Sequence, residues 1–246
     1  MSSSRPPPPP PPPPLLPLRS LNIHPDFSSR EWCTRLLSDP GIANVVVPTD
    51  SAARAARLAG VSNSMFTETL NTPRTVRAQV SFNRPTHESD ALASTGPGDG
   101  SGDGEANTSP STSTADEYRR HTPREYCSLF SLGPGLDGKT GRAHGGFNAL
   151  LLDQLTGHVG VVFGGSSAPA TATMTVDYRA PISTPGVVLG RAWAVERSGR
   201  KTWVKGVIED GEGKALAAAK ALFVDPKPVT PEGSCVGDDA KAKSKL

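Results

Sequence analysis

The spacing of hydrophobic residues changes once between residues 145 and 224, from a helical pattern to a strand-like alternation. This change constrains the fold more than any other feature of the sequence. Residues 145–157 carry four leucines around one carboxylate and are predicted to form a single long helix. From residue 171 onward the repeat becomes an alternation, which is typical of strands with one buried face. Four strands are predicted there, over residues 171–178, 187–197, 201–209 and 214–224.

Short turns separate the last three of these strands, at residues 198–200 and 210–213. The alanine run of the last strand would suit a helix on propensity alone, but the DG-type turn before it favours a hairpin. Two earlier strands are expected over residues 76–82 and 125–133. The order of two strands, one helix and then four strands in a meander predicts an α+β fold. In this fold an antiparallel sheet wraps around one long central helix.

Composition separates this folded part from segments of low complexity. Hydrophobic residues make up only 35% of the 246 residues, and glycine and proline number 25 each, which indicates disordered parts. Two short helices are expected at residues 28–38 and 51–59. The predicted organisation is a disordered proline-rich arm (1–22), a helical N-terminal extension (23–75), a folded domain (76–224) with a disordered insertion at about 86–120, and a flexible tail (225–246).

Charge, cysteines and apolar runs narrow the classes of function. A net charge of +2 without blocks of like charge gives no electrostatic case for nucleic-acid binding. No stretch approaches the roughly 18–20 apolar residues of a membrane span. Cys33, Cys127 and Cys235 show neither a disulfide framework nor metal-ligand spacing, so a cytoplasmic or mitochondrial protein without a metal is expected.

The nine consecutive prolines in the arm predict polyproline II structure, because proline fixes φ and lacks an N–H donor. A passive tail is the favoured interpretation of this arm. The alternative is that it binds a proline-binding domain of a partner protein.

The stretch GRAHGGFNALLLDQ sets Asp153 nine residues after His144, among leucines. Acidic side chains are seldom fully buried unless something pairs with them. Gly145 and Gly146 are expected to begin the helix, where the first N–H groups have no internal partner and the helix dipole is positive. Spacing alone leaves two alternatives for Asp153, a solvent-facing acid and a functional carboxylate.

Three segments taken together resemble a known family. AHGGFNALLLDQ is followed by TATMTVDYRAPI and then by ERSGRKTWVKGVIEDGEGKALAAAKALFV. This combination resembles the hotdog-fold acyl-CoA thioesterases, most closely their PaaI-like and THEM4-like branch, over roughly residues 76–82 and 125–224. The resemblance implies the hotdog fold and the hydrolysis of acyl-CoA to a free acid and coenzyme A, with no cofactor.

The resemblance also implies roles for individual residues. The N–H of Gly145, with Gly146 beside it, would polarise the thioester carbonyl, and Asp153 would act as general base or nucleophile. Thr171 would orient the water or the carboxylate. His144 is expected to have a positioning role, with base action as the alternative.

The same resemblance bears on three further positions. Many relatives carry Asn or Gln six residues before the histidine, where this chain has Gly138, so one contact to the carbonyl is missing from the expected set. Arg200 and Lys201 lie on a predicted hairpin turn. Contact with the phosphates of coenzyme A and a simple solvated turn are equal alternatives for them.

Gly145 and Asp153 are eight residues apart, which is about 12 Å along a helix axis, so one carbonyl cannot contact both on the same helix. Two antiparallel helices related by a two-fold axis solve this problem and form two sites. A homodimer, or a dimer of dimers, is therefore expected. The alternatives to a thioesterase are a non-catalytic protein that binds acyl thioesters as a scaffold, and a hotdog dehydratase.

Overall fold

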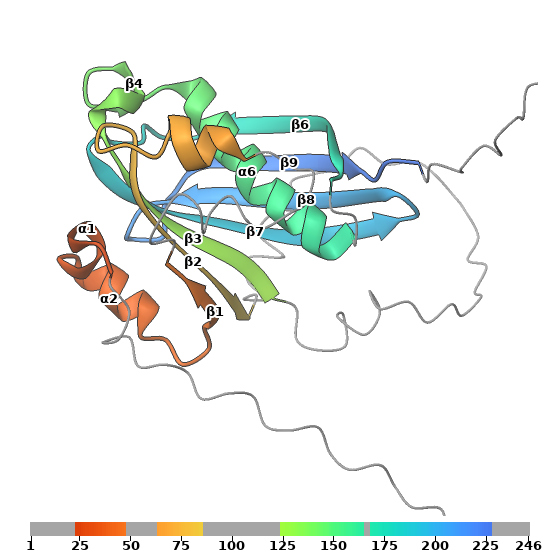
Figure 1. Cartoon of the computed structure of the whole chain (residues 1–246), viewed down its shortest axis with the longest axis horizontal. Helices are drawn as coiled ribbons and strands as arrows, with labels where there is room; N and C mark the ends of the chain where they lie inside the picture. The colour runs from red at the N-terminus through yellow and green to blue at the C-terminus, as the bar shows by residue number, and fades with distance from the viewer. Residues whose placement is uncertain (1–22, 48–62, 86–123, 165–167, 228–246) are drawn as a thin grey trace, which may run out of the picture.

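A computed structural model describes residues 23–47, 63–85, 124–164 and 168–227. It contains one curved, seven-stranded antiparallel sheet and a single long helix, α6 (Gly145–Gly164), which lies across it (Figure 1). The strand order is β1-β2-β3-β7-β8-β9-β6. The strands are β1 (Ala43–Val46), β2 (Val76–Pro85), β3 (Arg124–Leu132), β6 (Ala170–Tyr178), β7 (Gly186–Ser198), β8 (Lys201–Glu209) and β9 (Ala215–Val224). This confirms the α+β hotdog fold predicted from the sequence.

The main core lies between α6 and the inner face of the sheet. Leu151, Leu152 and Leu155 of α6 are almost fully buried and belong to one cluster with Phe130 of β3 and Ile208 of β8. The helix continues to Gly164, beyond the predicted end at residue 157, because Val159 and the following turn also pack on the sheet. Among the described residues, no helix is both long and apolar enough to cross a membrane.

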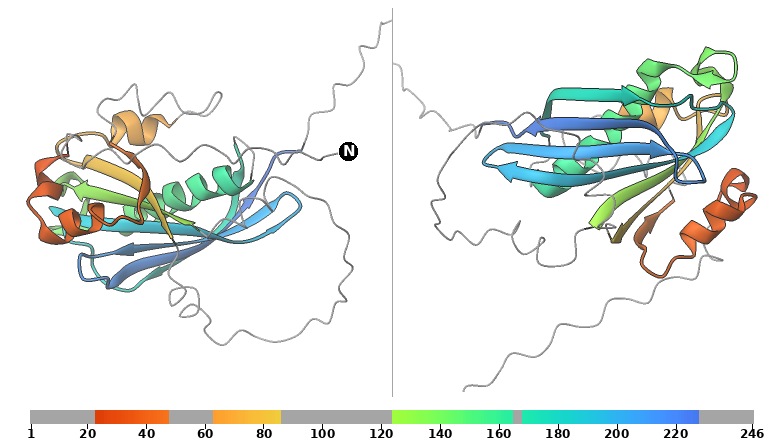
Figure 2. Two further views of the ribbon diagram at one scale, coloured as in Figure 1. Left: turned by 90° about the horizontal axis from the view of Figure 1, so that it is seen from below. Right: turned by 180° about the vertical axis from the view of Figure 1, so that it is seen from behind.

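A second, smaller core lies on the opposite face of the sheet, under α1 (Pro25–Ser28) and α2 (Glu31–Leu37). Figure 2 shows these two helices beside the β1–β2 end, away from α6. The alternation over residues 76–82 predicts one common face for Val76, Ala78, Val80 and Phe82. A register shift between Val76 and Ala78 instead turns Val76 toward α6, while the other three face the second core.

The N-terminal extension is not purely helical. The predicted helix at residues 28–38 is the shorter α2, which α1 precedes, and the extension also supplies the edge strand β1 and a π-helical turn over Met65–Thr69. The expected helix at 51–59 lies outside the described residues, as do the proline-rich arm, the insertion and most of the tail.

The predicted four-stranded meander is wrong in one respect. Strands β7, β8 and β9 form consecutive hairpins, but β6 pairs with β9 at the far edge of the sheet and β7 pairs with β3. Most of β6 is exposed, and only Met174 and Val176 of its side chains pack on the main core. This threonine-rich strand therefore lies beside β9 at an edge of the sheet rather than beside β7.

The two predicted turns have the expected conformations. Gly199 and Gly213 adopt positive φ angles of 56° and 81°, which favour glycine. The Asp210 carboxylate accepts the N–H groups of Glu212 and Lys214, each at 2.9 Å. These bonds close the tight turn that leads into β9, and residues 215–224 form a strand rather than a helix.

Replacing each of two glycines of α6 by alanine should change the free energy of unfolding in opposite directions. A Cβ on Gly160 would lie 2.9 Å from Cγ of the buried Phe223, whereas a Cβ on Gly157 would lie 3.6 Å from the same ring. Gly160→Ala should lower the free energy of unfolding by about 1–3 kcal/mol through overpacking. Gly157→Ala should raise it by about 1 kcal/mol through helix propensity. Urea denaturation measures both, and equal effects of the two variants would contradict this packing.

Candidate active site

The first residues of α6 form a capped helix end with one free donor. The Gly146 N–H donates to Nδ1 of His144 at 2.9 Å, and the His144 carbonyl oxygen accepts the N–H groups of Phe147 and Asn148. His144 is therefore the cap of the helix and occupies the N–H of Gly146. No hydrogen bond within the described residues uses the Gly145 N–H, so Gly145 is the glycine that offers a donor to a ligand.

Tyr178, at the end of β6, fixes the edge strand to this helix end. Its hydroxyl donates to the carbonyl oxygen of Gly145 at 3.2 Å, and a Cβ on Gly145 would lie 3.6 Å from its ring. The sequence analysis placed Tyr178 in the alternation of its strand and missed this contact. The two residues are separated by 33 positions, and no local pattern relates them.

Asp153 is half-buried and paired with Thr171 near the start of β6. The Thr171 hydroxyl donates to Oδ1 of Asp153 at 3.0 Å. While Leu152 and Leu155 are buried in the core, Asp153 lies on the flank of the helix that borders β6. The structure therefore brings together Asp153 and Thr171, as the sequence analysis expected.

The chain does not bring Asp153 to Gly145. Along α6 they are separated by about 12 Å, and they contact residues at opposite ends of β6, Thr171 and Tyr178. One chain therefore holds two half-sites on the flank of α6 that borders β6. Within the described residues, β6 pairs with β9 on one side and with no strand on the other.

A pocket of about 510 Å³ opens at the N-terminal end of α6. Its wall contains Gly145, Tyr178 and Asn148. Asn148 is only 6% exposed, and its buried Oδ1 atom has no hydrogen-bond partner among the described residues. The remaining lining residues include three exposed cations and no carboxylate; the cations are Lys139, Arg142 and Arg179. From the sequence alone Arg179 is expected to be a surface residue, and no pattern singles out the other two cations or Asn148.

Gly138, the position where relatives carry an amide, also lines this pocket. A Cβ there would lie 2.9 Å from both Cα and Cδ2 of His144, so a side chain would fit only if His144 moved. The neighbouring Asp137 does not replace the amide. Its carboxylate accepts the Thr184 hydroxyl and the Gly141 N–H, which holds the turn between β4 (Asp137–Lys139) and β5 (Arg142–Ala143).

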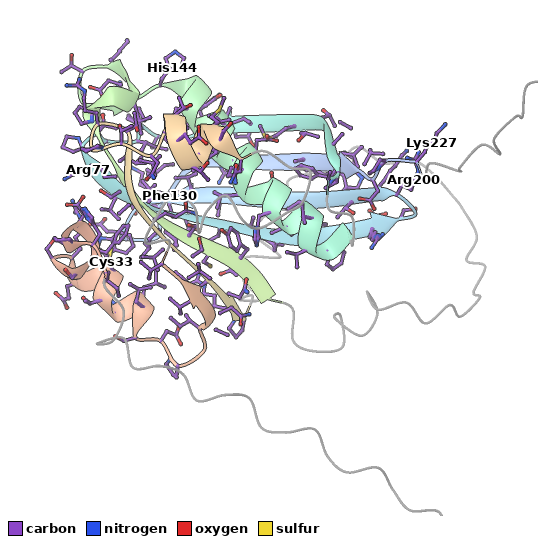
Figure 3. All side chains as sticks on the ribbon, in the orientation of Figure 1. Cys33, Arg77, Phe130, His144, Arg200 and Lys227 are labelled. Carbon is purple, nitrogen blue, oxygen red and sulfur yellow. The ribbon has the colours of Figure 1, made fainter. Side chains whose placement is uncertain are left out.

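Arg200 and Lys201 lie far from the helix N-terminus. Figure 3 shows Arg200 and His144 at opposite ends of the molecule. Lys201 pairs with Val224, which in turn pairs with Ala170, so the turn lies at the end of the sheet that carries Thr171. Both side chains are exposed, and Arg200 donates to the carbonyl oxygen of Asp225 at 2.6 Å.

The two described cysteines are not poised as nucleophiles. Burial raises the pKa of Cys33 to about 12, and burial together with the nearby Glu125 carboxylate raises the pKa of Cys127 well above its ordinary value. Because the thiolate is the reactive form, both side chains stay protonated at neutral pH. Within the described residues, neither thiol is therefore available as a nucleophile at neutral pH.

Comparisons with known proteins agree with this fold. Residues 140–217 match the model of the thioesterase superfamily. The acyl-coenzyme A thioesterase THEM4 of Xenopus laevis is 35% identical over 108 residues, which are 44% of this chain and 47% of that protein. The protein of the same name from Mus musculus is 36% identical over 107 residues, which are 42% and 45% of the two chains.

The chain thus spans about half the length of the curated relatives it matches. Among solved structures, a thioesterase superfamily protein is 30% identical with a TM-score of 0.38, covering 41% of this chain and 49% of that chain. A hypothetical thioesterase from Streptococcus pneumoniae, whose structure contains coenzyme A, is 21% identical with a TM-score of 0.38. That match covers 41% of this chain and 77% of the other.

Proposed function

We propose that this chain hydrolyses acyl-CoA thioesters to a free acid and coenzyme A. The observation that carries the proposal is the pair of half-sites on one flank of α6. A free Gly145 N–H lies at the helix N-terminus, and Asp153, held by Thr171, lies about two turns further along. The relatives named acyl-coenzyme A thioesterases support this activity for the half of their length that the chain matches.

In this proposal the two half-sites do the two tasks that thioester hydrolysis requires. The carbonyl oxygen of the substrate accepts the Gly145 N–H at the positive end of the helix dipole, which stabilises the negative charge that develops on the oxygen. Asp153 either takes a proton from an attacking water or attacks the carbonyl carbon itself. In both routes the carbon–sulfur bond breaks, the thiolate of coenzyme A leaves and takes up a proton, and water supplies the oxygen of the acid.

A complete site requires a second copy of the chain. If two α6 helices lie antiparallel about a two-fold axis, Gly145 of one chain lies next to Asp153 of the other, and both sites form at once. The exposed edge of β6 supports this arrangement, because an edge strand without a partner favours pairing with another chain. We propose a homodimer as the active unit, and a dimer of two such dimers would keep the same sites.

The charges around the half-sites suit an anionic substrate. Lys139, Arg142 and Arg179 surround the pocket at Gly145, and in the proposed dimer Arg200 and Lys201 of the second chain approach the same site from the Thr171 end. Coenzyme A carries several phosphate charges, which exposed cations attract. We therefore assign these five cations to attracting and holding its nucleotide end.

One observation favours a second candidate function. Because Gly138 contributes no side-chain amide, the chain would act only as a binding or scaffold protein for acyl thioesters if the remaining groups do not suffice for turnover. A hotdog dehydratase is less well supported. Such enzymes need an Asp/His pair positioned next to the acyl chain of the substrate, whereas His144 is engaged as the helix cap.

Purified protein and a panel of acyl-CoAs of different chain length separate these functions. We expect release of free thiol, detected with a thiol-reactive dye, together with formation of the free acid. Water addition or loss across the acyl chain with the thioester intact would support the dehydratase instead. Binding of the same acyl-CoAs by calorimetry without any thiol release would leave only the binding function and contradict hydrolysis.

A further inference from the structure

The two ring nitrogens of His144 are used differently by the folded chain. Nδ1 accepts the N–H of Gly146 at 2.9 Å. A ring nitrogen that accepts a hydrogen bond carries no proton, so the proton of the neutral imidazole is on Nε2. No hydrogen bond among the described residues uses this Nε2–H. The helix cap therefore fixes Nε2 as the donor and leaves it available to a ligand.

Two glycines leave the space that the His144 ring occupies. A Cβ on Gly138 would lie 2.9 Å from Cδ2 of the ring, and a Cβ on Gly146 would lie 3.3 Å from Cε1. Nε2 is bonded to both of these ring carbons, so it forms the corner of the ring that lies farthest from the His144 backbone. A side chain at position 138 would begin against the ring edge next to Nε2. The imidazole thus occupies the space in which a side-chain amide of residue 138 would begin.

We infer that His144 is a further catalytic residue, whose Nε2–H donates a hydrogen bond to the thioester carbonyl oxygen; this inference rests on the proposed hydrolysis. His144 and Gly145 are consecutive and line the same pocket, so an oxygen held at the Gly145 N–H lies next to the ring. A donor that the cap holds in place before the substrate binds needs no reorganisation when negative charge develops on that oxygen. The imidazole then takes over the contact for which Gly138 has no side chain.

Replacing His144 by asparagine or by glutamine separates the tasks of its two nitrogens. Asparagine is a favoured N-cap whose oxygen accepts the Gly146 N–H in place of Nδ1, but its side chain is too short to reach the position of Nε2. Glutamine is one bond longer, so its NH2 group reaches that position, although glutamine is not among the favoured capping residues.

Kinetics and stability should therefore rank the two variants in opposite orders. His144→Asn should lower kcat by about 100-fold, the effect of losing one carbonyl donor, at an unchanged thermal midpoint. His144→Gln should have a kcat about tenfold above that of His144→Asn, although its thermal midpoint falls. A histidine that only caps the helix predicts the same order for kcat and for the thermal midpoint.

His24→Asn is the matched control, because His24 caps α1 in the same way. Its Nδ1 accepts the N–H of Asp26 at 3.2 Å, and α1 covers the second core on the opposite face of the sheet from α6. The exchange of a capping histidine for asparagine should leave kcat at the wild-type value there.

A thioether analogue of acyl-CoA, in which CH2 replaces the carbonyl, separates the contact with the oxygen from general shaping of the pocket. The wild type and His144→Asn should bind this analogue with equal Kd. Weaker binding by His144→Asn, or unchanged kcat in that variant, would overturn the inference and leave the proposed function standing. An equal loss of kcat in His144→Asn and His144→Gln would also overturn it, since that result indicates a base. Absence of hydrolysis by the wild type would overturn the proposed function, and this role of His144 with it.

Discussion

Asp153→Asn is expected to lower kcat for acyl-CoA hydrolysis by about 10²–10⁴-fold with little change in KM. The asparagine oxygen still accepts the Thr171 hydroxyl, which donates to Oδ1 of Asp153 at 3.0 Å, so the side chain keeps its position. An amide, however, neither removes a proton from water at neutral pH nor attacks a carbonyl as a carboxylate does. Steady-state kinetics of thiol release gives both constants.

Asp177→Asn is the matched control, since it makes the same change at an exposed carboxylate of β6. Asp177 lines a different groove, together with Arg191 and Lys205, and should keep wild-type kinetics. Calorimetry with the same acyl-CoA should show that Asp153→Asn still binds its substrate. Wild-type kcat in Asp153→Asn would exclude Asp153 as base and as nucleophile.

Attack by water and attack by the Asp153 carboxylate differ in the order in which thiol and acid are released. Direct attack by Asp153 forms an acyl anhydride, so thiol is released before acid and a burst of about one thiol per site is expected when the second step is slow. Attack by water releases thiol and acid together. Rapid-quench measurement of both products in the wild type therefore decides between the two routes that the geometry leaves open.

The secondary structure of the domain was predictable because its signals are local. The leucines of α6 and the alternation of β7, β8 and β9 are visible in windows of about ten residues, and the turns carry glycine at the positions that need it. The place of β6 was not predictable in this way. Its pairing with β9 joins Thr171 to Phe223, 52 positions away, and a meander satisfies the same local pattern.

The candidate site could be predicted from the sequence only where its residues belong to a recognisable motif. Asp153 and Gly145 were proposed because their types and spacing resemble a family, and Thr171, proposed on the same ground, donates a hydrogen bond to Asp153. Asn148 was not found, because asparagine in a helix is ordinary in sequence and becomes unusual only when its burial and missing partner are known. The contact of Tyr178 with Gly145 was not predicted for the same reason, since it depends on the fold.

The cap formed by His144 explains why two consecutive glycines are not equivalent. The Gly146 N–H is used inside the chain, while the Gly145 N–H faces the pocket without a partner among the described residues. Proline lacks the N–H and suits the first position of a helix, where its fixed φ costs little. Gly145→Pro therefore removes the proposed donor without removing a helix hydrogen bond.

Gly145→Pro is expected to lower kcat/KM by about 10²–10³-fold, the loss typical of one such donor. Gly145→Ala is the matched control, because it keeps the N–H and its Cβ makes only an ordinary contact with Tyr178, at 3.6 Å. It should lose far less activity. Thermal unfolding should show that α6 still forms in both variants. Equal kinetics of the two variants would exclude the Gly145 N–H as a donor to the carbonyl.

Combining Gly145→Pro with Asp153→Asn in separate chains tests the shared site directly. In a heterodimer purified through two different tags, one site takes Gly145 from the Asp153→Asn chain and Asp153 from the Gly145→Pro chain and is intact, while the other site carries both defects. About half of the wild-type turnover per dimer should return, although each variant alone is nearly inactive. A site built within one chain predicts no recovery, because every chain then carries one defect.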